Sequence, residues 1–205
     1  MHNHYFHNLN LAKWLLEAKP RCVVECGAGT GELTTHLVGL KNKLGFRLCV
    51  ISDNDPGFGS DVEFIRGISY KELEKFPDNS IDFCIIDTDH NYWTLAKELE
   101  VLHKKLSDGA YVAIHDVATF YHDTGMALSY SDGSPYPKDA IESCAPSMGG
   151  LGNALMDFLH IFKFDYRLVE FTSESHGAAI IQKKVLLGIS IMVPGDKPMY
   201  AGVNK

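Results

Sequence analysis

Strand-length apolar runs alternate with segments of helical period through the first half of the chain, and this alternation limits the fold more than any other feature. The apolar runs cover residues 21–26, 46–52, 61–67, 80–87 and 110–116. Segments with helical spacing separate them at 32–44, 69–76 and 92–106. Continuous apolar strands are typical of parallel sheets that are buried on both faces. We therefore predict an α/β fold, with a Rossmann-like, doubly wound, mostly parallel sheet and helices on both faces.

The alternation stops after residue 116. Residues 117–148 are rich in Gly, Pro, Ser and Tyr, and a loop of this length inside a compact domain is a functional lid or a disordered segment. We predict an inserted lid there that closes over a substrate. A helix resumes at 149–162, and residues 165–184 indicate a strand, a turn and an antiparallel return, which brings the sheet to seven strands. Residues 185–194 extend that return or add an edge strand, and the sequence leaves both options open.

Composition excludes several classes of protein. A chain of 205 residues is expected to form one domain, here 1–205. The net charge of -7 and the scattered Lys residues argue against a nucleic-acid partner. No apolar run approaches the roughly 20 residues of a membrane helix, so we expect no membrane association. Five cysteines without a C-x-x-C pair favour reduced thiols and a cytoplasmic location. The oligomeric state stays open, and a homodimer is one option.

Three glycines stand between the first strand and its helix, at Gly27, Gly29 and Gly31. Glycines let the backbone turn sharply and approach a ligand closely at a helix N-terminus. The dinucleotide fingerprint G-x-G-x-x-G needs its third glycine at the position of Glu32, so this loop does not fit it. The acid Glu25 at the strand end would repel a pyrophosphate, which favours a cationic or amino-bearing ligand.

This pattern resembles motif I of the class I S-adenosylmethionine-dependent methyltransferases, E/D-x-G-x-G-x-G. The resemblance implies that the backbone of Gly27–Gly31, with Ala28 inside it, holds the methionine part of S-adenosylmethionine. It also implies that Glu25 lies near the amino group of the cofactor. A simple glycine-rich turn without a ligand is the alternative.

The next strand ends extend the same resemblance. Asp53 follows the second strand, where the family has an acid that binds both ribose hydroxyls, and Asp55 is the second choice. Ile68 and Ser69 follow the third strand, where the family contacts adenine. The alternative role for Asp53 is a helix N-cap.

A second group of polar residues follows the fourth and fifth strands. Asp87, Asp89 and His90 come after one, and His115 and Asp116 end the other. The carboxyl ends of parallel strands converge on one crevice, so we expect these side chains at one rim. Oxygen-rich sets suit Mg²⁺, Mn²⁺ or Ca²⁺, and imidazole shifts the preference toward transition metals.

The motifs D-x-D-H-x-Y and H-D resemble those of small bacterial O-methyltransferases, and more distantly the catechol and caffeoyl-coenzyme A type with D-x-D-K and D-N. By position, the resemblance makes Asp87 and Asp116 metal ligands, His115 a third ligand, and His90 the replacement of the Lys that assists deprotonation. Asp87 also counts among the cofactor contacts. His115 in place of an aspartate weakens the case for Mg²⁺ over another divalent cation, and a metal-free His base stays open. Asp89 can instead cap the following helix, as Asn91 can, and His115 can be a core histidine.

These features predict S-adenosylmethionine-dependent methyl transfer to a hydroxyl of a small-molecule acceptor, assisted by a divalent metal, by a His base, or by both. In the predicted lid, Tyr121, Tyr130 and Tyr136 would offer stacking surface and His122 could reach the substrate. The rival classes are an NAD-linked oxidoreductase, which Glu32 disfavours, and a non-catalytic cofactor-binding module.

Overall fold

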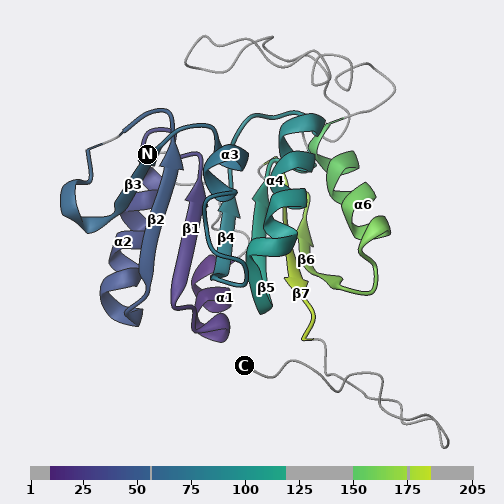
Figure 1. Ribbon diagram of the computed structural model, residues 1–205, viewed down its shortest axis with the longest axis horizontal. Coiled ribbons are helices and arrows are strands. Elements are labelled where there is room, and N and C mark those ends of the chain that lie inside the picture. Colours follow the sequence, from purple (N-terminus) through teal and green to yellow (C-terminus); the bar gives the residue numbers. More distant parts are fainter. Residues whose placement is uncertain (1–9, 56, 119–149, 175, 186–205) are drawn as a thin grey trace, which may run out of the picture.

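The computed structural model describes residues 10–55, 57–118, 150–174 and 176–185. Seven strands form one sheet in the order β3-β2-β1-β4-β5-β7-β6 (Figure 1). Their bounds are β1 (Cys22–Cys26), β2 (Arg47–Ser52), β3 (Glu63–Arg66), β4 (Ile81–Ile86), β5 (Leu106–His115), β6 (Tyr166–Thr172) and β7 (Ala178–Lys183). The first five strands run parallel, and β7 lies antiparallel to both β5 and β6. The predicted mostly parallel sheet with an antiparallel last strand is confirmed.

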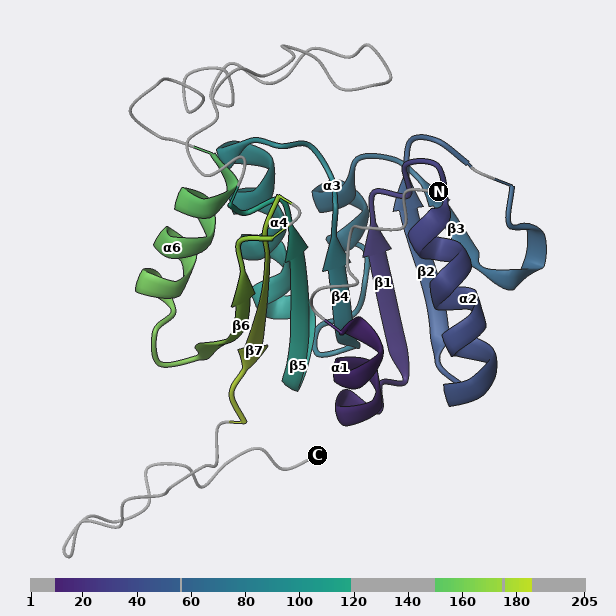
Figure 2. The same ribbon diagram turned by 180° about the vertical axis from the view of Figure 1, so that it is seen from behind.

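Helices cover both faces of this sheet. They are α1 (Leu11–Ala18), α2 (Glu32–Leu44), α3 (Ser69–Leu73), α4 (Tyr92–Lys105) and α6 (Leu151–Ile161), with a short 3-10 turn η2 (Gly59–Asp61). Figure 1 shows α3, α4 and α6 in front of the sheet, and Figure 2 shows α1 and α2 on the opposite face. Each face has its own apolar core: Leu99 and Leu155 belong to one, and Leu15 and Leu37 to the other. The predicted doubly wound arrangement is therefore present.

Several element bounds differ from the sequence prediction. The helix α1 was not predicted, although Asn10 caps it by accepting a hydrogen bond from the Lys13 backbone N–H at 3.2 Å. The strand β5 begins at Leu106, which the prediction placed at the end of the preceding helix. The third strand is shorter than 61–67 because residues 59–61 form the turn η2. Most of the predicted lid and all but the first residue of 185–194 lie outside the described residues.

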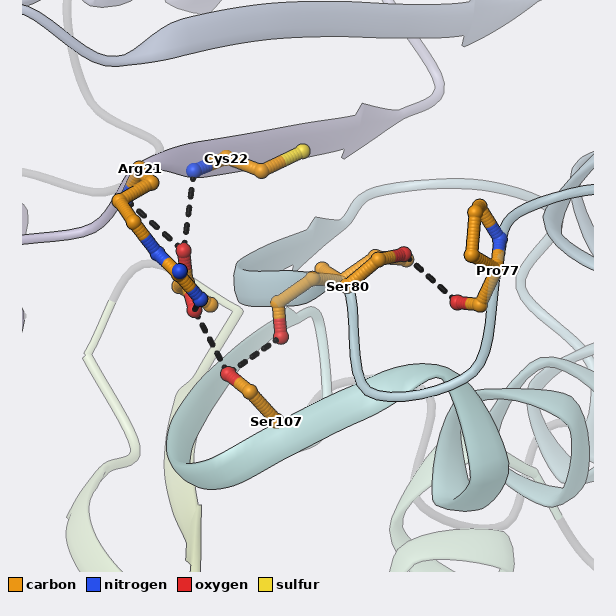
Figure 3. Close-up of polar contacts among 7 residues, drawn as sticks. Arg21, Cys22, Pro77, Ser80 and Ser107 are labelled. Atoms are coloured by element: carbon orange, nitrogen blue, oxygen red, sulfur yellow. Dashed lines mark hydrogen bonds and ion pairs between the residues drawn. The ribbon is translucent and has the colours of Figure 1, made fainter. Parts of the chain in front are cut away.

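At the amino ends of the strands, one carboxylate joins three of them. The backbone N–H groups of Arg21 and Cys22 donate to Asp82 Oδ2 at 2.8 and 3.1 Å, and Ser107 Oγ donates to Asp82 Oδ1 at 2.7 Å. Figure 3 shows Arg21, Cys22 and Ser107 converging on this point. Asp82 thereby ties β1, β4 and β5 together at the edge opposite to their carboxyl ends, and so fixes the register of the strands that end at the polar rim described below.

None of the described helices has the length and apolar character needed to cross a membrane. The four cysteines of the described residues are buried free thiols, at Cys22, Cys26, Cys49 and Cys84. The thiols agree with the reduced state expected from the sequence, and the cytoplasmic location stays a prediction.

Candidate functional site

The glycine loop after β1 packs directly on the residue that follows β4. Gly27 has φ +86°, and its N–H donates to Ile51 O at 2.8 Å, while the Asp87 N–H donates to Cys26 O at 2.9 Å. A Cβ atom on Gly27 would lie 1.9 Å from the Asp87 carbonyl oxygen. Only glycine fits this contact, so the sequence requirement at position 27 comes from the close approach of two strand ends as well as from the turn.

The loop then leads into the N-terminus of α2. Gly31 caps this helix with φ +84° and no side-chain cap, and its N–H donates to Ala28 O at 2.7 Å. Gly29 has φ +50°, and its carbonyl accepts from Asn54 Nδ2 at 3.2 Å. The first turn of α2 thus presents backbone N–H groups and the positive end of the helix dipole beside the loop, which suits a carboxylate of a ligand.

A cavity of about 490 Å³ lies along the carboxyl ends of the strands, within the usual size range of small-ligand pockets. It is lined by Gly27, Gly29, Ile51, Ser52, Asp53, Arg66, Gly67, Ile68, Ser69, Lys71, Glu72, Asp87, Thr88 and Asp89. We call it the rim pocket. The predicted cofactor residues among its walls are Gly27, Gly29, Asp53, Ile68, Ser69 and Asp87. Glu25, Ala28, Gly31 and Asp55 are not among its walls.

Glu25 lies beneath the loop rather than in the rim pocket. Its side chain is fully buried and accepts a hydrogen bond from Thr34 Oγ1 of α2 at 2.8 Å. Its Oε1 has no hydrogen-bond partner within the part of the chain that the structure describes. Burial raises the pKa of this carboxyl to about 8 in spite of the Thr34 bond, and the nearby Asp87 adds to the rise. The proximity of Glu25 to a cofactor amino group stays a prediction.

The two acids after β2 occupy different environments. Asp53 borders the rim pocket, and its carbonyl oxygen accepts from Arg66 Nη1 at 2.9 Å, which ties the turn to the end of β3. Asp55 uses Oδ1 to accept from the Gly57 N–H at 2.8 Å within its own turn. The geometry therefore keeps Asp53 ahead of Asp55 as the ribose candidate.

Two carboxylates and two imidazoles meet where β4 and β5 end side by side. His90 Nε2 lies 2.8 Å from Asp116 Oδ2. His115 Nδ1 lies 2.9 Å from Asp116 Oδ1 and 3.3 Å from Asp87 Oδ1. We call these four residues the rim cluster. The expectation that the fourth and fifth strands bring these side chains to one rim agrees with the parallel pairing of β4 and β5.

The backbone of Asp116 is unusual. With φ +61° it adopts the left-handed conformation, which few non-glycine residues occupy and in which aspartate is enriched. Asp116 directly follows the strand residue His115, and its carboxylate nevertheless contacts both His115 and His90. Such conformations cluster at functional sites, where the surrounding contacts hold them in place.

Mutual contacts shift the protonation of the cluster. Burial lowers the pKa of His115, but its ion pairs with Asp116 and Asp87 outweigh burial and raise this pKa to about 9. Burial raises the pKa of Asp116, but its contacts with His115 and His90 outweigh burial and lower this pKa to about 2. The bond to Asp116 also raises the pKa of His90. A proton on His115 therefore balances negative charge of the carboxylates in the rim cluster near neutral pH.

Three members of the rim cluster have the geometry of a metal-binding group. One ligand atom each from Asp87, His90 and Asp116 lies within 4.8 Å of the other two. Two carboxylate oxygens and one imidazole nitrogen form a donor set that fits a divalent cation. The sequence predicted His115 as the third ligand, and in the structure its Nδ1 contacts both carboxylates instead. His115 is suited to orienting those carboxylates, and its ligation of a metal stays a prediction.

Asn91 caps the N-terminus of α4. Its side chain accepts from the Thr94 N–H at 2.7 Å, whereas the carbonyl of Asp89 accepts from the Asn91 N–H at 2.8 Å. The alternative in which Asp89 caps α4 is therefore wrong, and Asp89 lines the rim pocket.

Sequence reasoning missed Glu98. This fully buried residue of α4 accepts hydrogen bonds from Ser69 Oγ and from Thr88 Oγ1, the latter at 3.1 Å. Burial raises its pKa to about 8 against the effect of these two bonds. The spacing of Leu95, Glu98 and Leu102 contained the signal, because it places an acid on the apolar face of an amphipathic helix. The predicted lid residues Tyr121, His122, Tyr130 and Tyr136 lie outside the described residues.

Part of the chain is similar to a known protein family. A family model described as a methyltransferase domain matches residues 24–117. No curated protein matches this chain in sequence.

Solved structures share the fold at low identity. A candidate caffeoyl-CoA O-methyltransferase from Staphylococcus aureus is 17% identical with a TM-score of 0.56, and the match covers 86% of this chain and 82% of that one. An SAH-bound methyltransferase from Podospora anserina is 15% identical with a TM-score of 0.56, covering 84% and 75%. A candidate O-methyltransferase from Klebsiella pneumoniae is 13% identical with a TM-score of 0.58, covering 85% and 78%.

These structures support the fold, and the family match covers the strands that carry both the glycine loop and the rim cluster. Residues 24–117 therefore match a methyltransferase domain, and the fold around them is the one that these solved structures share.

Proposed function

We propose that the protein transfers a methyl group from S-adenosylmethionine to a hydroxyl of a small-molecule acceptor. One observation carries the proposal: Asp87 is both a wall of the rim pocket and a member of the metal-binding group. A cofactor in the rim pocket and an acceptor at the rim cluster would therefore meet at Asp87. Two of the structural neighbours are described as O-methyltransferases, and this description supports a hydroxyl acceptor.

The transfer needs positioning and proton removal. The acceptor oxygen forms a bond to the methyl carbon as the carbon–sulfur bond of the sulfonium breaks, and the hydroxyl proton passes to a base. The walls of the rim pocket and the rim cluster would hold the two reactants in line, which can supply much of the rate gain. His90 is the more accessible imidazole, with 39% of its side chain exposed against 1% for His115. In the metal-free version His90 is therefore the base, and Asp116 stabilises its protonated form.

The same residues fit a divalent cation. Held by Asp87, His90 and Asp116, it would lower the pKa of the acceptor hydroxyl and bind its oxygen. In that version His90 is a ligand, and the ion pairs of His115 Nδ1 with Asp87 and Asp116 keep the two carboxylates in place.

Calorimetry with S-adenosylmethionine and with NAD, each with and without Mg²⁺, tests the proposal. We expect binding of S-adenosylmethionine and none of NAD. Binding of NAD without binding of S-adenosylmethionine would refute the proposed function.

Substitution separates the metal-dependent version from the metal-free one. Asp87→Asn and Asp116→Asn should abolish a dependence of methyl transfer on Mg²⁺ or Mn²⁺, whereas Asp89→Asn should preserve it, since Asp89 is outside the metal-binding group. Turnover that a chelator leaves unchanged would support His90 as a metal-free base.

A further inference from the structure

The rim pocket has two walls that no strand pairing connects directly. Ser69 begins α3 after β3, and Thr88 follows β4 next to Asp87. In the sheet order, β2 and β1 stand between β3 and β4. The spacing of these walls therefore depends on contacts outside the sheet.

Glu98 supplies such a contact. From α4 it reaches Ser69 with Oε1 and Thr88 with Oε2, so that both oxygens of one side chain bridge the two walls. Figure 1 shows α3 and α4 on the same face of the sheet. The side chain is fully buried, and it stands on the helix face where Leu95, Leu99 and Leu102 pack into the core.

An apolar residue would suit that position better if packing were its sole purpose. Burying a carboxyl costs free energy that its two hydrogen bonds offset in part. The raised pKa of Glu98, which burial causes, reflects that cost. A bridging role explains why an acid stands where the helix pattern calls for leucine.

We propose that Glu98 is a positioning residue for cofactor binding, which holds the Ser69 and Thr88 walls of the rim pocket at the separation that S-adenosylmethionine requires. This inference rests on the proposed function. Glu98 does not line the rim pocket and acts through its two partners.

Two variants of nearly equal shape separate bridging from packing. Glu98→Met fills the same core volume and makes neither bond, while Glu98→Gln keeps an acceptor for one hydroxyl and a donor for the other. Calorimetry with S-adenosylhomocysteine gives the affinity, and thermal unfolding without ligand gives the stability. We expect Glu98→Met to fold and to bind about tenfold more weakly, the equivalent of about one net hydrogen bond. We expect Glu98→Gln to stay within about threefold of the wild type.

The inference is overturned if Glu98→Met binds as tightly as the wild type, or if both variants weaken binding equally. Should Glu98→Met fail to fold, Thr88→Val removes one partner of the bridge without altering α4, and Thr88→Ser keeps the hydroxyl. Weaker binding in Thr88→Val alone supports the bridge, and equal binding in the two refutes it. Wild-type protein that does not bind S-adenosylhomocysteine would refute the proposed function itself, which a change confined to Glu98 cannot do.

Discussion

Replacing Gly27 with alanine should destabilise the protein through one contact between strand ends. The new Cβ atom would lie 1.9 Å from the Asp87 carbonyl oxygen, and real Cβ atoms stay at least 3.0 Å from such atoms. The ends of β1 and β4 must therefore separate by about 1 Å. Such a shift lengthens the bond from Asp87 N to Cys26 O, which joins the ends of β4 and β1 and is now 2.9 Å, beyond hydrogen-bond range.

The matched control is Gly29→Ala. Gly29 also has positive φ, but a Cβ there would meet nothing within 4 Å. Both substitutions carry the left-handed strain of about 1–2 kcal/mol. Gly27→Ala also loses one hydrogen bond of about 1 kcal/mol, so we expect it to lower the free energy of unfolding by about 1 kcal/mol more than Gly29→Ala.

Urea unfolding followed by circular dichroism measures this difference. Because the displaced residue is Asp87, the folded Gly27→Ala variant should also lose methyl-transfer rate by about a hundredfold, as misplacement by 1 Å can cause. A destabilisation within about 0.5 kcal/mol of that of Gly29→Ala would show that the contact between the strand ends does not carry the effect.

Three further predictions concern charged groups. In Asp116→Asn the pKa of His90 should fall toward its ordinary value, because the carboxylate that raises it is gone; an unchanged imidazole titration by NMR would contradict the pairing. Glu25 is protonated in the folded state and ionised in the unfolded state between pH 4.5 and about 8, so it lowers stability as pH rises through that window, by up to about 1.4 kcal/mol per pH unit. Glu25→Gln should flatten this fall in urea unfolding curves, and a parallel fall in wild type and variant would refute the shift. Asp82→Ala should cost about 2–3 kcal/mol of unfolding free energy and Asp82→Asn less, since the amide keeps one acceptor for the bonds at the amino ends of the strands; equal losses would assign the effect to packing.

The parallel sheet could be predicted because its strands are continuous apolar runs, a pattern that burial on both faces requires. The boundary between α4 and β5 could not be predicted from the sequence. Leu106 continues the helical spacing of the preceding leucines, and it is equally suited to a buried strand position. Leu106 belongs to β5 because it pairs with Ile81 of β4. Such a tertiary contact has no signature in the local sequence.

The sequence predicted that the residues of the rim cluster lie together at the strand ends, but it did not predict their contacts. Asp87, His115 and Asp116 were expected together because parallel strands converge at their carboxyl ends. Their individual contacts depend on the left-handed backbone of Asp116, which lets one carboxylate touch both imidazoles. The spacing of these residues in the sequence does not reveal the φ angle of Asp116. It therefore could not predict which carboxylate oxygens His90 and His115 contact.

The antiparallel strand β7 has a consequence for the order in which the protein can assemble during synthesis. It follows all the other described strands in sequence, yet it lies inside the sheet between β5 and β6. Ala178, its first residue, pairs with His115 of the rim cluster. Strand β5 therefore exposes one unpaired edge, and β6 has no place in the sheet, until β7 has left the ribosome. The nascent chain can complete its parallel half early, but it cannot enclose the rim cluster before residue 183 is synthesised, and during that interval the open edge of β5 is the surface that a chaperone would need to shield.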